Sequence, residues 1–450
     1  MLRDYQQQGV AFLESRDKAL LCDDPGLGKT AQAIMCCLRK GLKTLVVCPH
    51  SIKDEWVREV RKWTDLKHLV IEGSAAKRAL QYHEEADFYI VNYETVIRDA
   101  EAISAIPYNC IILDEAQRIK NRKTLTARTV KGLRLPRYRY ILTATPIENS
   151  ISDLYSLMEF TGNGMYYGLR ASLTPTRGDY FYLDSRSFKP GPNQLRQMVS
   201  QASPEALHNA LKRFMLRRRK EDVDLQLPPK TNMILETQLT LEQKAMYVLA
   251  RDRFLLMVGD TTVPIVSVLA QLTYLREICN STALVSPKHP FSSKFEELVP
   301  RVKEAVLTGN KVIVFSEFKR FCDLIVAALR KEGLGVSYLH GQEKCIGAQK
   351  EAFWGENQVL VATRTGEVGH NLQCASYVFE MEPCWNPARV KQRQDRAHRL
   401  GQTKPVLIYS FVTPGTVEER IQATLHNKEE LFKEVIDRPE YRQWLRELVE

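Results

Sequence analysis

The sequence predicts an α/β protein of two domains, each with a parallel β-sheet covered by helices. The chain has 450 residues, which is more than one hydrophobic core usually supports. Short continuous apolar runs alternate with helical stretches, and this pattern is typical of parallel strands buried on both faces. The pattern occurs as two series, one within residues 1–150 and one after Pro300. Each series predicts one sheet.

The composition predicts a soluble intracellular protein that binds a polyanion. Lys and Arg number 64 against 54 Asp and Glu, so the formal net charge is +10. The ten cysteines include no Cys-x-x-Cys pair, and we expect core thiols in a reducing compartment. No apolar run approaches the roughly 18 residues of a membrane span, and the N-terminus lacks a secretory segment. We expect no membrane partner, and a location in cytoplasm or nucleoid for a bacterial or viral source, or in the nucleus for a eukaryotic one.

A phosphate loop is predicted after the apolar residues Leu20 and Leu21. Glycines let backbone N–H groups converge on an anion, and the dipole of the following helix favours negative charge there. Lys29 should reach the β- and γ-phosphates, and the Thr30 hydroxyl should ligate Mg²⁺. The match is to the relaxed pattern, because the strict one has glycine where Asp23 stands. A helix start that carries Gly-Lys-Thr by chance remains the alternative at this point. The cofactor-binding candidates are Asp24, Pro25, Gly26, Leu27, Gly28, Lys29 and Thr30.

Residues 2–13 precede this loop and predict a helix, with apolar side chains at 2, 5, 10 and 13. The ring of Tyr5 and the amide of Gln6 could hold adenine. An ordinary amphipathic helix is the alternative.

Polar side chains follow the predicted strands of the first series. Parallel sheets bind ligands at the carboxyl ends of their strands. Asp114 and Glu115 follow one of these strands, where a phosphate-loop ATPase has a Mg²⁺-holding aspartate and a water-positioning glutamate. Together with the phosphate loop they indicate ATP hydrolysis. The strands are predicted at residues 44–48, 88–91, 110–113 and 140–143.

From residue 151 to about 237 the strand pattern is predicted to stop, and residues 162–193 receive no regular element. Residues 211–220 hold six basic side chains in ten. They could form a phosphate-contacting surface or a hinge strap, or simply a solvated charged face. Residues 241–284 predict helix, broken by Pro264.

The second series has no phosphate loop, but it carries two arginines. Arg396 and Arg399 are three residues apart and would share one face of a helix. Arginines that reach in from another domain can neutralise charge on a transferred phosphoryl group. Hydrolysis would then need closure of the two domains, and each ATP cycle would become a mechanical stroke. An exposed basic helix is the alternative. A last helix should begin at Thr416 and pack back onto the core. The strands are predicted at residues 311–315, 335–339, 359–362, 377–379 and 406–410.

Taken together, the motifs resemble those of the Swi/Snf-type DNA translocases of helicase superfamily two. They occur in the family's order and cover nearly the whole chain. The last match, with Trp-Asn-Pro ahead of it, is highly specific. The matching stretches are residues 2–6 (LRDYQ), 24–30 (DPGLGKT), 114–121 (DEAQRIKN), 142–149 (LTATPIEN), 216–220 (LRRRK), 227–230 (LPPK), 385–387 (WNP) and 395–402 (DRAHRLGQ).

The resemblance implies two RecA-like domains with helical insertions and a C-terminal brace helix. It also implies an ATP- and Mg²⁺-dependent, monomeric motor that tracks along double-stranded DNA and remodels DNA-bound proteins or branched DNA. The chain is expected to be close to a bare motor. The implied divisions are a first lobe at 1–150, its insertion at 151–237, a helical insertion at 238–300, a second lobe at 301–415 and the brace at 416–450.

The resemblance also implies roles for single residues. The implied catalytic residues are Lys29, Asp114, Glu115, Arg396 and Arg399. The implied nucleotide-binding residues also include Tyr5, Gln6 and Gly366. Residues expected to face DNA are Pro49, His50, Ser51, Asn92, Tyr93, Thr143, Thr363, Arg364, Thr365, Asn371 and Trp385. The chain departs from the family at Pro25, where methionine is usual, at Gln117, where histidine is commoner, and at Glu367 and His370, where small or apolar residues prevail.

Two other functions compete with the translocase. A strand-separating helicase or RNA-dependent ATPase of the same superfamily would carry the same motifs. A DNA-binding scaffold with an inactive ATPase is the non-enzymatic alternative, and the joint presence of Lys29, Asp114, Glu115, Arg396 and Arg399 argues against it.

Overall fold

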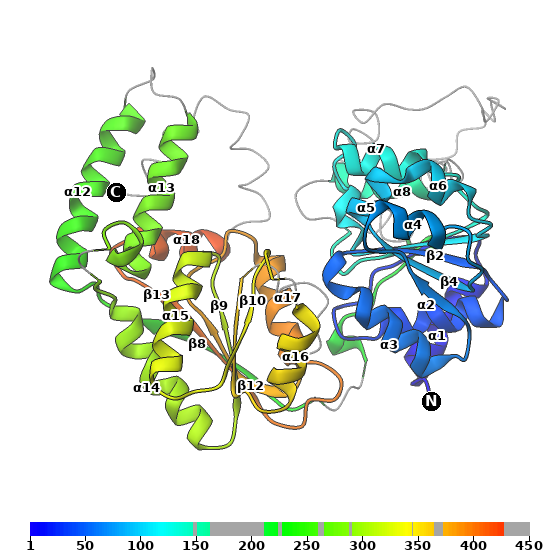
Figure 1. The fold of residues 1–450 in the computed structure, drawn as a ribbon. Helices are drawn as coiled ribbons and strands as arrows, with labels where there is room; N and C mark the ends of the chain where they lie inside the picture. The colour runs from blue at the N-terminus through cyan, green and yellow to red at the C-terminus, as the bar shows by residue number, and fades with distance from the viewer. Residues whose placement is uncertain are drawn as a thin grey trace, which may run out of the picture. The chain divides into compact units, whose positions relative to one another are not determined.

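The computed structural model describes residues 1–146, 151–162, 211–223, 227–259, 265–287, 290–343, 345–363 and 372–426. The chain divides into two compact units, Met1–Leu225 and Gln226–Glu450. Each unit contains one sheet in which all strand pairs are parallel, with helices packed against it (Figure 1). The predicted α/β class with two parallel sheets is confirmed.

The sheet of the first unit has the strand order β3-β4-β2-β5-β6-β1-β7. Its central strands β2, β4 and β5 are buried at every position, which explains their unbroken apolar sequences. The strands are β1 Lys18–Leu21, β2 Thr44–Cys48, β3 His68–Val70, β4 Phe88–Asn92, β5 Cys110–Asp114, β6 Tyr138–Leu142 and β7 Met215–Leu216.

Helices cover both faces of this sheet. In Figure 1, α1, α2 and α3 lie on one face, and α5, α6, α7 and α8 lie on the other. The helices are α1 Asp4–Glu14, α2 Lys29–Arg39, α3 Lys53–Trp63, α4 Ala75–Gln81, α5 Tyr93–Arg98, α6 Ala100–Ala105, α7 Leu125–Gly132 and α8 Ile151–Thr161, with short 3₁₀ turns at His50–Ile52, Ala116–Ile119 and Lys220–Asp222.

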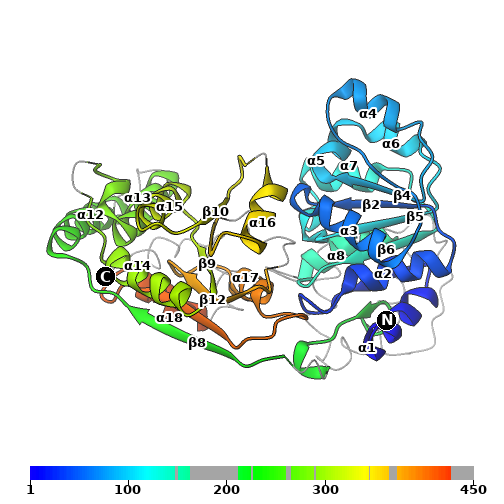
Figure 2. The same cartoon turned by 60° about the horizontal axis from the view of Figure 1, so that its bottom comes forward.

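The sheet of the second unit has the order β10-β11-β9-β12-β13-β8. Figure 2 shows β8 along the edge of this sheet. The strands are β8 Lys230–Glu236, β9 Lys311–Phe315, β10 Val336–Leu339, β11 Val359–Ala362, β12 Ala375–Glu380 and β13 Val406–Val412, and the helices are α12 Leu241–Gly259, α13 Ile265–Asn280, α14 Ser293–Leu307, α15 Lys319–Lys331, α16 Ile346–Trp354, α17 Pro387–Ala397 and α18 Val417–His426, with a 3₁₀ turn at Thr282–Leu284.

A helical pair and the last described helix pack together in the second unit. Side chains of α12 and α13 share a buried cluster with Val417 and Ile421 of α18. The start of the tail helix therefore follows the prediction, and α18 braces the helical pair.

Several expectations about elements are wrong. The strand pattern does not stop between 151 and 237, because β7 and β8 lie there; β7 is only two residues long, and β8 is an edge strand whose burial alternates. Strand β3 is also missed. Pro300 lies inside α14, and the first strand predicted after it, at residues 311–315, is β9. Residues 162–193 lie outside the described residues, except Gly162.

The structure describes all ten cysteines and helices in both units. All ten cysteines are free thiols, and eight of them are buried. Among the described residues, no helix is both long and apolar enough to cross a bilayer.

Candidate active site

The predicted phosphate loop joins β1 to α2. Gly28 is the N-cap of α2 with φ +76°, and a Cβ built there would lie 2.4 Å from Nε2 of Gln6, so only glycine fits. Lys29 is the first residue of α2, and its ammonium donates a hydrogen bond to the Asp23 carbonyl oxygen at 2.7 Å. The loop thus has the strand-turn-helix form of a phosphate cradle.

Helix α1 lies against this loop through the residues expected on the adenine side. The Gln6 side-chain amide donates to the Leu27 carbonyl oxygen at 3.3 Å. Tyr5 is buried, and its hydroxyl has no hydrogen-bond partner among the described residues. The structure therefore brings Tyr5 and Gln6 beside the loop.

Arg218, two residues after β7, supports the loop through contacts that the sequence did not reveal. Its guanidinium donates from Nε to Oδ1 of Asp23 at 3.0 Å and from Nη2 to Oε1 of Gln32 at 2.8 Å, and it lies 5.3 Å from the Tyr5 ring centroid. Asp23 is fully buried, and this pairing explains how a carboxylate can replace the glycine of the strict pattern. Within the basic run, Arg218 is thus a structural residue, whereas Arg217 and Arg219 are exposed.

Asp114 ends β5 with its carboxylate held by two donors. The Trp56 indole N–H donates to Oδ2 at 2.8 Å, and the Glu115 backbone N–H donates to Oδ1 at 2.9 Å. Burial, followed by the negative charge of Glu115, raises the pKa of Asp114 to about 7. A nearby cation would favour the charged carboxylate.

Glu115 has an unusual backbone and a bonded neighbour. Its φ of +49° makes it the one non-glycine residue with positive φ in the described part of the chain. Nε2 of Gln117 donates to Glu115 Oε2 at 2.8 Å, and the Thr143 hydroxyl donates to Gln117 Oε1 at 2.9 Å. Gln117, the departure from the commoner histidine, therefore connects Glu115 to the end of β6.

The residues expected to face DNA in this unit differ in exposure. His50 is exposed and Ser51 is half-buried, directly after β2, whereas Pro49 is buried.

Tyr93 and Thr143 are buried, and both hydroxyls are bonded inside the unit, Tyr93 to the Asp114 carbonyl oxygen at 2.9 Å. Asn92 is also buried, with its amide bonded to Glu94. The hydroxyls of Tyr93 and Thr143 are therefore already used by bonds inside the unit.

In the second unit, Thr363 follows β11 and is largely buried, and the half-buried Trp385 follows β12. The Arg276 guanidinium lies 5.9 Å from the Trp385 ring centroid. Arg364, Thr365, Gly366 and Asn371, like Glu367 and His370, lie outside the described residues.

The two predicted arginine fingers do not share a helix. Helix α17 ends at Ala397, so Arg396 lies in its last turn and Arg399 lies beyond its end. The prediction that both occupy one helical face is wrong, because the chain turns before Gly401, whose φ is +94°. Buried Arg396 and half-buried Arg399 remain close in sequence at the same end of α17.

Helix α17 is held by a buried glutamate that follows β9. Arg389 and Arg393 of α17 each approach Oε1 of Glu317 to 3.5 Å, and Arg276 of α13 approaches Oε2 to 3.1 Å. Burial raises the pKa of Glu317, but the charges of Arg276 and Arg393 outweigh this effect and hold the pKa below its usual value. Glu317 thus fixes the helix that leads to Arg396 and Arg399.

Comparison with known proteins identifies the family. A family model described as the SNF2-related domain matches residues 5–284, and one described as the helicase conserved C-terminal domain matches residues 293–401. The chain belongs to the SNF2 family. It therefore carries the domains of a helicase-like ATPase that uses ATP.

Curated SNF2-family relatives are much longer than this chain. The human TATA-binding protein-associated factor 172 is 30% identical, over 97% of this chain and 28% of that protein. The ISWI chromatin-remodeling complex ATPase CHR11 of Arabidopsis thaliana is 28% identical, over 95% of this chain and 42% of that protein. Among solved structures, the Sulfolobus solfataricus SWI2/SNF2 ATPase core in complex with dsDNA is 27% identical, with 100% of this chain and 97% of that chain covered and a TM-score of 0.43.

The donors of this SNF2-family site suit Mg²⁺. Asp114 offers a carboxylate and Thr30 a hydroxyl, and Mg²⁺ is usually bound by few protein oxygens together with phosphates and water. The raised pKa of Asp114 fits this assignment, since it marks a buried carboxylate that a cation would stabilise. In the described residues, no group of three His, Cys, Asp or Glu side chains forms a metal site independent of the nucleotide.

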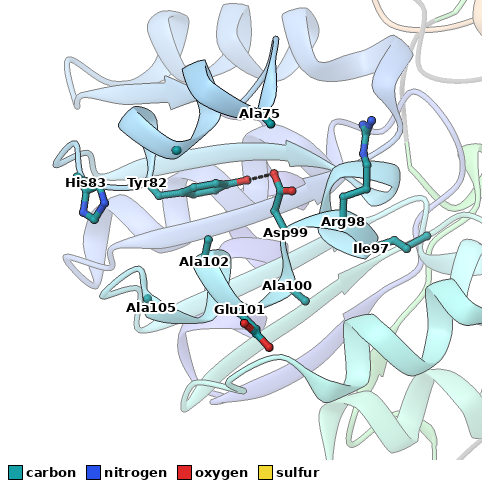
Figure 3. Close-up of a pocket in the computed structure, with 11 residues that line it drawn as sticks. Ala75, Tyr82, His83, Ile97, Arg98, Asp99, Ala100, Glu101, Ala102 and Ala105 are labelled. Carbon is teal, nitrogen blue, oxygen red and sulfur yellow. Dashed lines mark hydrogen bonds between the residues drawn. The ribbon is translucent and has the colours of Figure 1, made fainter.

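A separate pocket of about 780 Å³ lies away from the predicted site, and none of the predicted site residues lines it (Figure 3). The Tyr82 hydroxyl and Nε of Arg78 each donate to Oδ2 of Asp99 at 2.5 Å. The Asp99 carboxylate in this pocket is therefore occupied by structural bonds.

The residues that sequence reasoning missed are Trp56, Asp23, Gln32 and Arg218. Trp56 lies four residues from buried Ile52 of the preceding 3₁₀ turn and four from buried Val60 of α3, so the sequence signals a core position and nothing more. Its partner Asp114 is far away in the sequence, and no local pattern indicates such a bond.

Proposed function

We propose that this chain couples ATP hydrolysis to movement along double-stranded DNA, and thereby remodels protein–DNA complexes or branched DNA. It acts as a monomeric motor that requires Mg²⁺. The observation that carries this proposal is the arrangement around Asp114. The carboxylate is electrostatically coupled to Lys29 of the phosphate loop, and it is hydrogen-bonded to Trp56 of the helix that follows His50 and Ser51.

In the proposed mechanism, Lys29 and the backbone of residues 24–28 hold the phosphates, and Tyr5 and Gln6 lie beside the adenine. Thr30 and Asp114 would hold Mg²⁺, which supplies positive charge to the phosphate oxygens when it is bound. Glu115 positions the attacking water and accepts its proton.

Arg396 and Arg399 supply positive charge to the transferred phosphoryl group from the second unit. Gly366 is assigned to the nucleotide side. This division of labour requires the two units to close on each other during a cycle, which provides the mechanical step.

We propose that residues after the strand ends of both units contact the sugar–phosphate backbone of the DNA. Such contacts suit a chain with a net charge of +10. In the first unit we assign them to Pro49, His50, Ser51 and Asn92, with Tyr93 and Thr143 in support. In the second unit we assign them to Thr363, Arg364, Thr365, Asn371 and Trp385.

The names of the relatives favour the remodelling part of this proposal. One is associated with the TATA-binding protein, and another is the ATPase of a chromatin-remodeling complex. Because the chain covers less than half of either protein, targeting to a particular complex is not part of the proposal.

The test is the steady-state ATPase rate of the full chain without nucleic acid and with single-stranded DNA, duplex DNA or RNA, at one salt concentration. We expect duplex DNA to stimulate the rate most. The duplex should then support displacement of a third strand without separation of its own strands, and Lys29→Ala should lose both activities. Stimulation mainly by single strands or by RNA, with unwinding of a tailed duplex, would instead establish the helicase or RNA-dependent ATPase. An ATPase rate unaffected by every nucleic acid would overturn the motor proposal.

A further inference from the structure

Two buried aromatic donors contact Asp114. The Trp56 indole donates to the carboxylate at 2.8 Å, and the Tyr93 hydroxyl donates to the backbone carbonyl of the same residue at 2.9 Å. Each aromatic side chain is only 1% exposed. These bonds are therefore shielded from water. A hydrogen bond is electrostatically stronger in such an interior than in water.

The two donors come from the segments that follow neighbouring strand ends. Trp56 lies on α3, one turn after the His50–Ile52 3₁₀ turn that follows β2. Tyr93 is the first residue of α5, directly after β4. Strands β4, β2 and β5 are adjacent and parallel, so the three carboxyl ends lie at one edge of the sheet.

The two bonds to the carboxylate constrain its orientation. Trp56 fixes Oδ2, and the Glu115 backbone N–H fixes Oδ1. Both donors are neutral, so they orient the carboxylate without cancelling its charge. A shift of α3 would move one carboxylate oxygen, and a shift of α5 would move the backbone that carries it.

We propose that Trp56 and Tyr93 are positioning residues, which link the segments that follow β2 and β4 to the Asp114 carboxylate and thereby couple DNA binding to binding of the metal–nucleotide. The DNA part of this inference rests on the proposed function. The metal part rests on the assignment of Mg²⁺ to Asp114 but not on DNA binding, because it concerns contacts within the first unit alone.

The decisive variant is Trp56→Phe, which keeps an aromatic ring but removes the N–H. Trp63→Phe is the matched control, because Trp63 lies on the same helix and its indole also donates to a carboxylate, Oε2 of Glu59 at 2.8 Å. The measurement is the dissociation constant of a fluorescent ATP analogue for the full chain, with and without Mg²⁺ and with and without duplex DNA.

Trp56→Phe should weaken binding about tenfold or more in Mg²⁺, the loss typical of one hydrogen bond to a charged group. Binding without Mg²⁺ should be unchanged, because Asp114 would act through the metal. If Trp56 had a purely structural role, its replacement would weaken nucleotide binding both with and without Mg²⁺. Equal binding by Trp56→Phe and Trp63→Phe in Mg²⁺ would overturn the inference.

The DNA part of the experiment uses reciprocity. If one ligand raises the affinity of the protein for a second ligand, the second raises the affinity for the first by the same factor. We expect duplex DNA to lower the dissociation constant of the metal–nucleotide for the wild-type chain and for Trp63→Phe. In Trp56→Phe the factor by which DNA lowers this constant should fall towards one. An unchanged factor in Trp56→Phe would overturn the coupling. If DNA has no effect on wild-type binding or hydrolysis, the proposed function fails and the coupling fails with it, while the Mg²⁺ arm still decides the positioning role.

Tyr93→Phe covers the case in which Trp56→Phe fails to fold, because it removes one hydroxyl with almost no change in volume. It should reduce the Mg²⁺-dependent part of binding in the same direction. In the Asp114→Asn background, Trp56→Phe and Tyr93→Phe should have no further effect in Mg²⁺. Additive losses in that background would overturn the assignment of both residues to Asp114.

Discussion

The acidic pair of the first unit and two buried glutamates of the second unit have opposite kinds of polar partners. In the first unit, neutral groups donate hydrogen bonds to the acidic pair: the Trp56 indole contacts Asp114, and Gln117 joins Glu115 to Thr143. In the second unit, full charges are buried against one another. Glu317 lies among three arginines, and Lys294 pairs with Glu418 at 2.7 Å, both of them 0% exposed.

This difference separates a site that acts on a ligand from a site that holds a helix. Neutral donors orient a carboxylate and leave its charge available, whereas arginine or lysine partners satisfy the charge within the protein. The first unit therefore leaves the charge of Asp114 without a cationic side chain bonded to it in the described contacts, and the second unit uses its charges to fix α17 and α18. Both sheets are parallel, so the side chains and not the sheet topology account for the difference.

The largest expected effect is that of Glu115→Gln in the first unit. Glutamine can still accept the Gln117 hydrogen bond but cannot take a proton from water. We expect kcat for ATP to fall by about 10³, within the range for loss of a general base, with nucleotide binding unchanged. Steady-state hydrolysis and binding of a fluorescent ATP analogue measure the two quantities.

The matched control for that variant is Glu59→Gln on α3, which should hydrolyse ATP like the wild-type chain. Turnover of Glu115→Gln within a few-fold of wild type would remove Glu115 from the catalytic assignment. The neutral surroundings of the acidic pair would then have a structural purpose only.

A smaller effect, on stability, is expected from Lys294→Met in the second unit. Lys294 also donates to Asn280 Oδ1 at 2.9 Å and to the Met381 carbonyl oxygen at 2.6 Å. Loss of the ammonium leaves Glu418 buried without its cation, so the free energy of unfolding of this unit should fall by about 3–5 kcal/mol. Urea unfolding, with hydrogen exchange of α14 amides to localise the loss, provides the measurement.

Lys303→Met on the same helix is the control, because Lys303 pairs with Glu332 at 2.6 Å but at the exposed surface. That variant should cost at most about 1 kcal/mol. Lys294→Met combined with Glu418→Leu should recover much of the loss, since no unpaired charge remains. Equal costs for the two lysine variants would refute the contrast between buried and exposed pairs.

These contacts also define what the sequence could predict. Continuous apolar strands and the residues after them predicted two parallel sheets, the phosphate loop and the acidic pair, because those signals are local and periodic. The pairs Trp56 with Asp114 and Arg218 with Asp23 join residues 58 and 195 positions apart, and only the folded sheet brings them together. The end of α17 before Arg399 depended on a turn at Gly401 that spacing alone did not show. β8 was missed because an edge strand needs burial on one side only.

The smallest expected effect is the pH dependence of Glu317→Gln, which isolates the charge that holds α17. Since the folded-state pKa of Glu317 is lowered, its stabilisation is fully present above the unfolded-state pKa of about 4.3 and is lost as pH falls through the folded-state value. At neutral pH the variant should therefore be less stable than the wild-type chain by about 2 kcal/mol, the scale of one hydrogen bond to a charged group. The difference should shrink as pH falls below about 4.

Urea unfolding of both chains across this pH range tests the prediction, with Glu297→Gln as the control for an exposed glutamate that pairs with Arg301 at 2.8 Å. The control should differ little from wild type at any pH. A Glu317→Gln difference that stays constant from pH 7 to pH 3 would mean that shape, not charge, holds α17. In that case the contrast between the two units would rest on the buried pair of Lys294 and Glu418 alone.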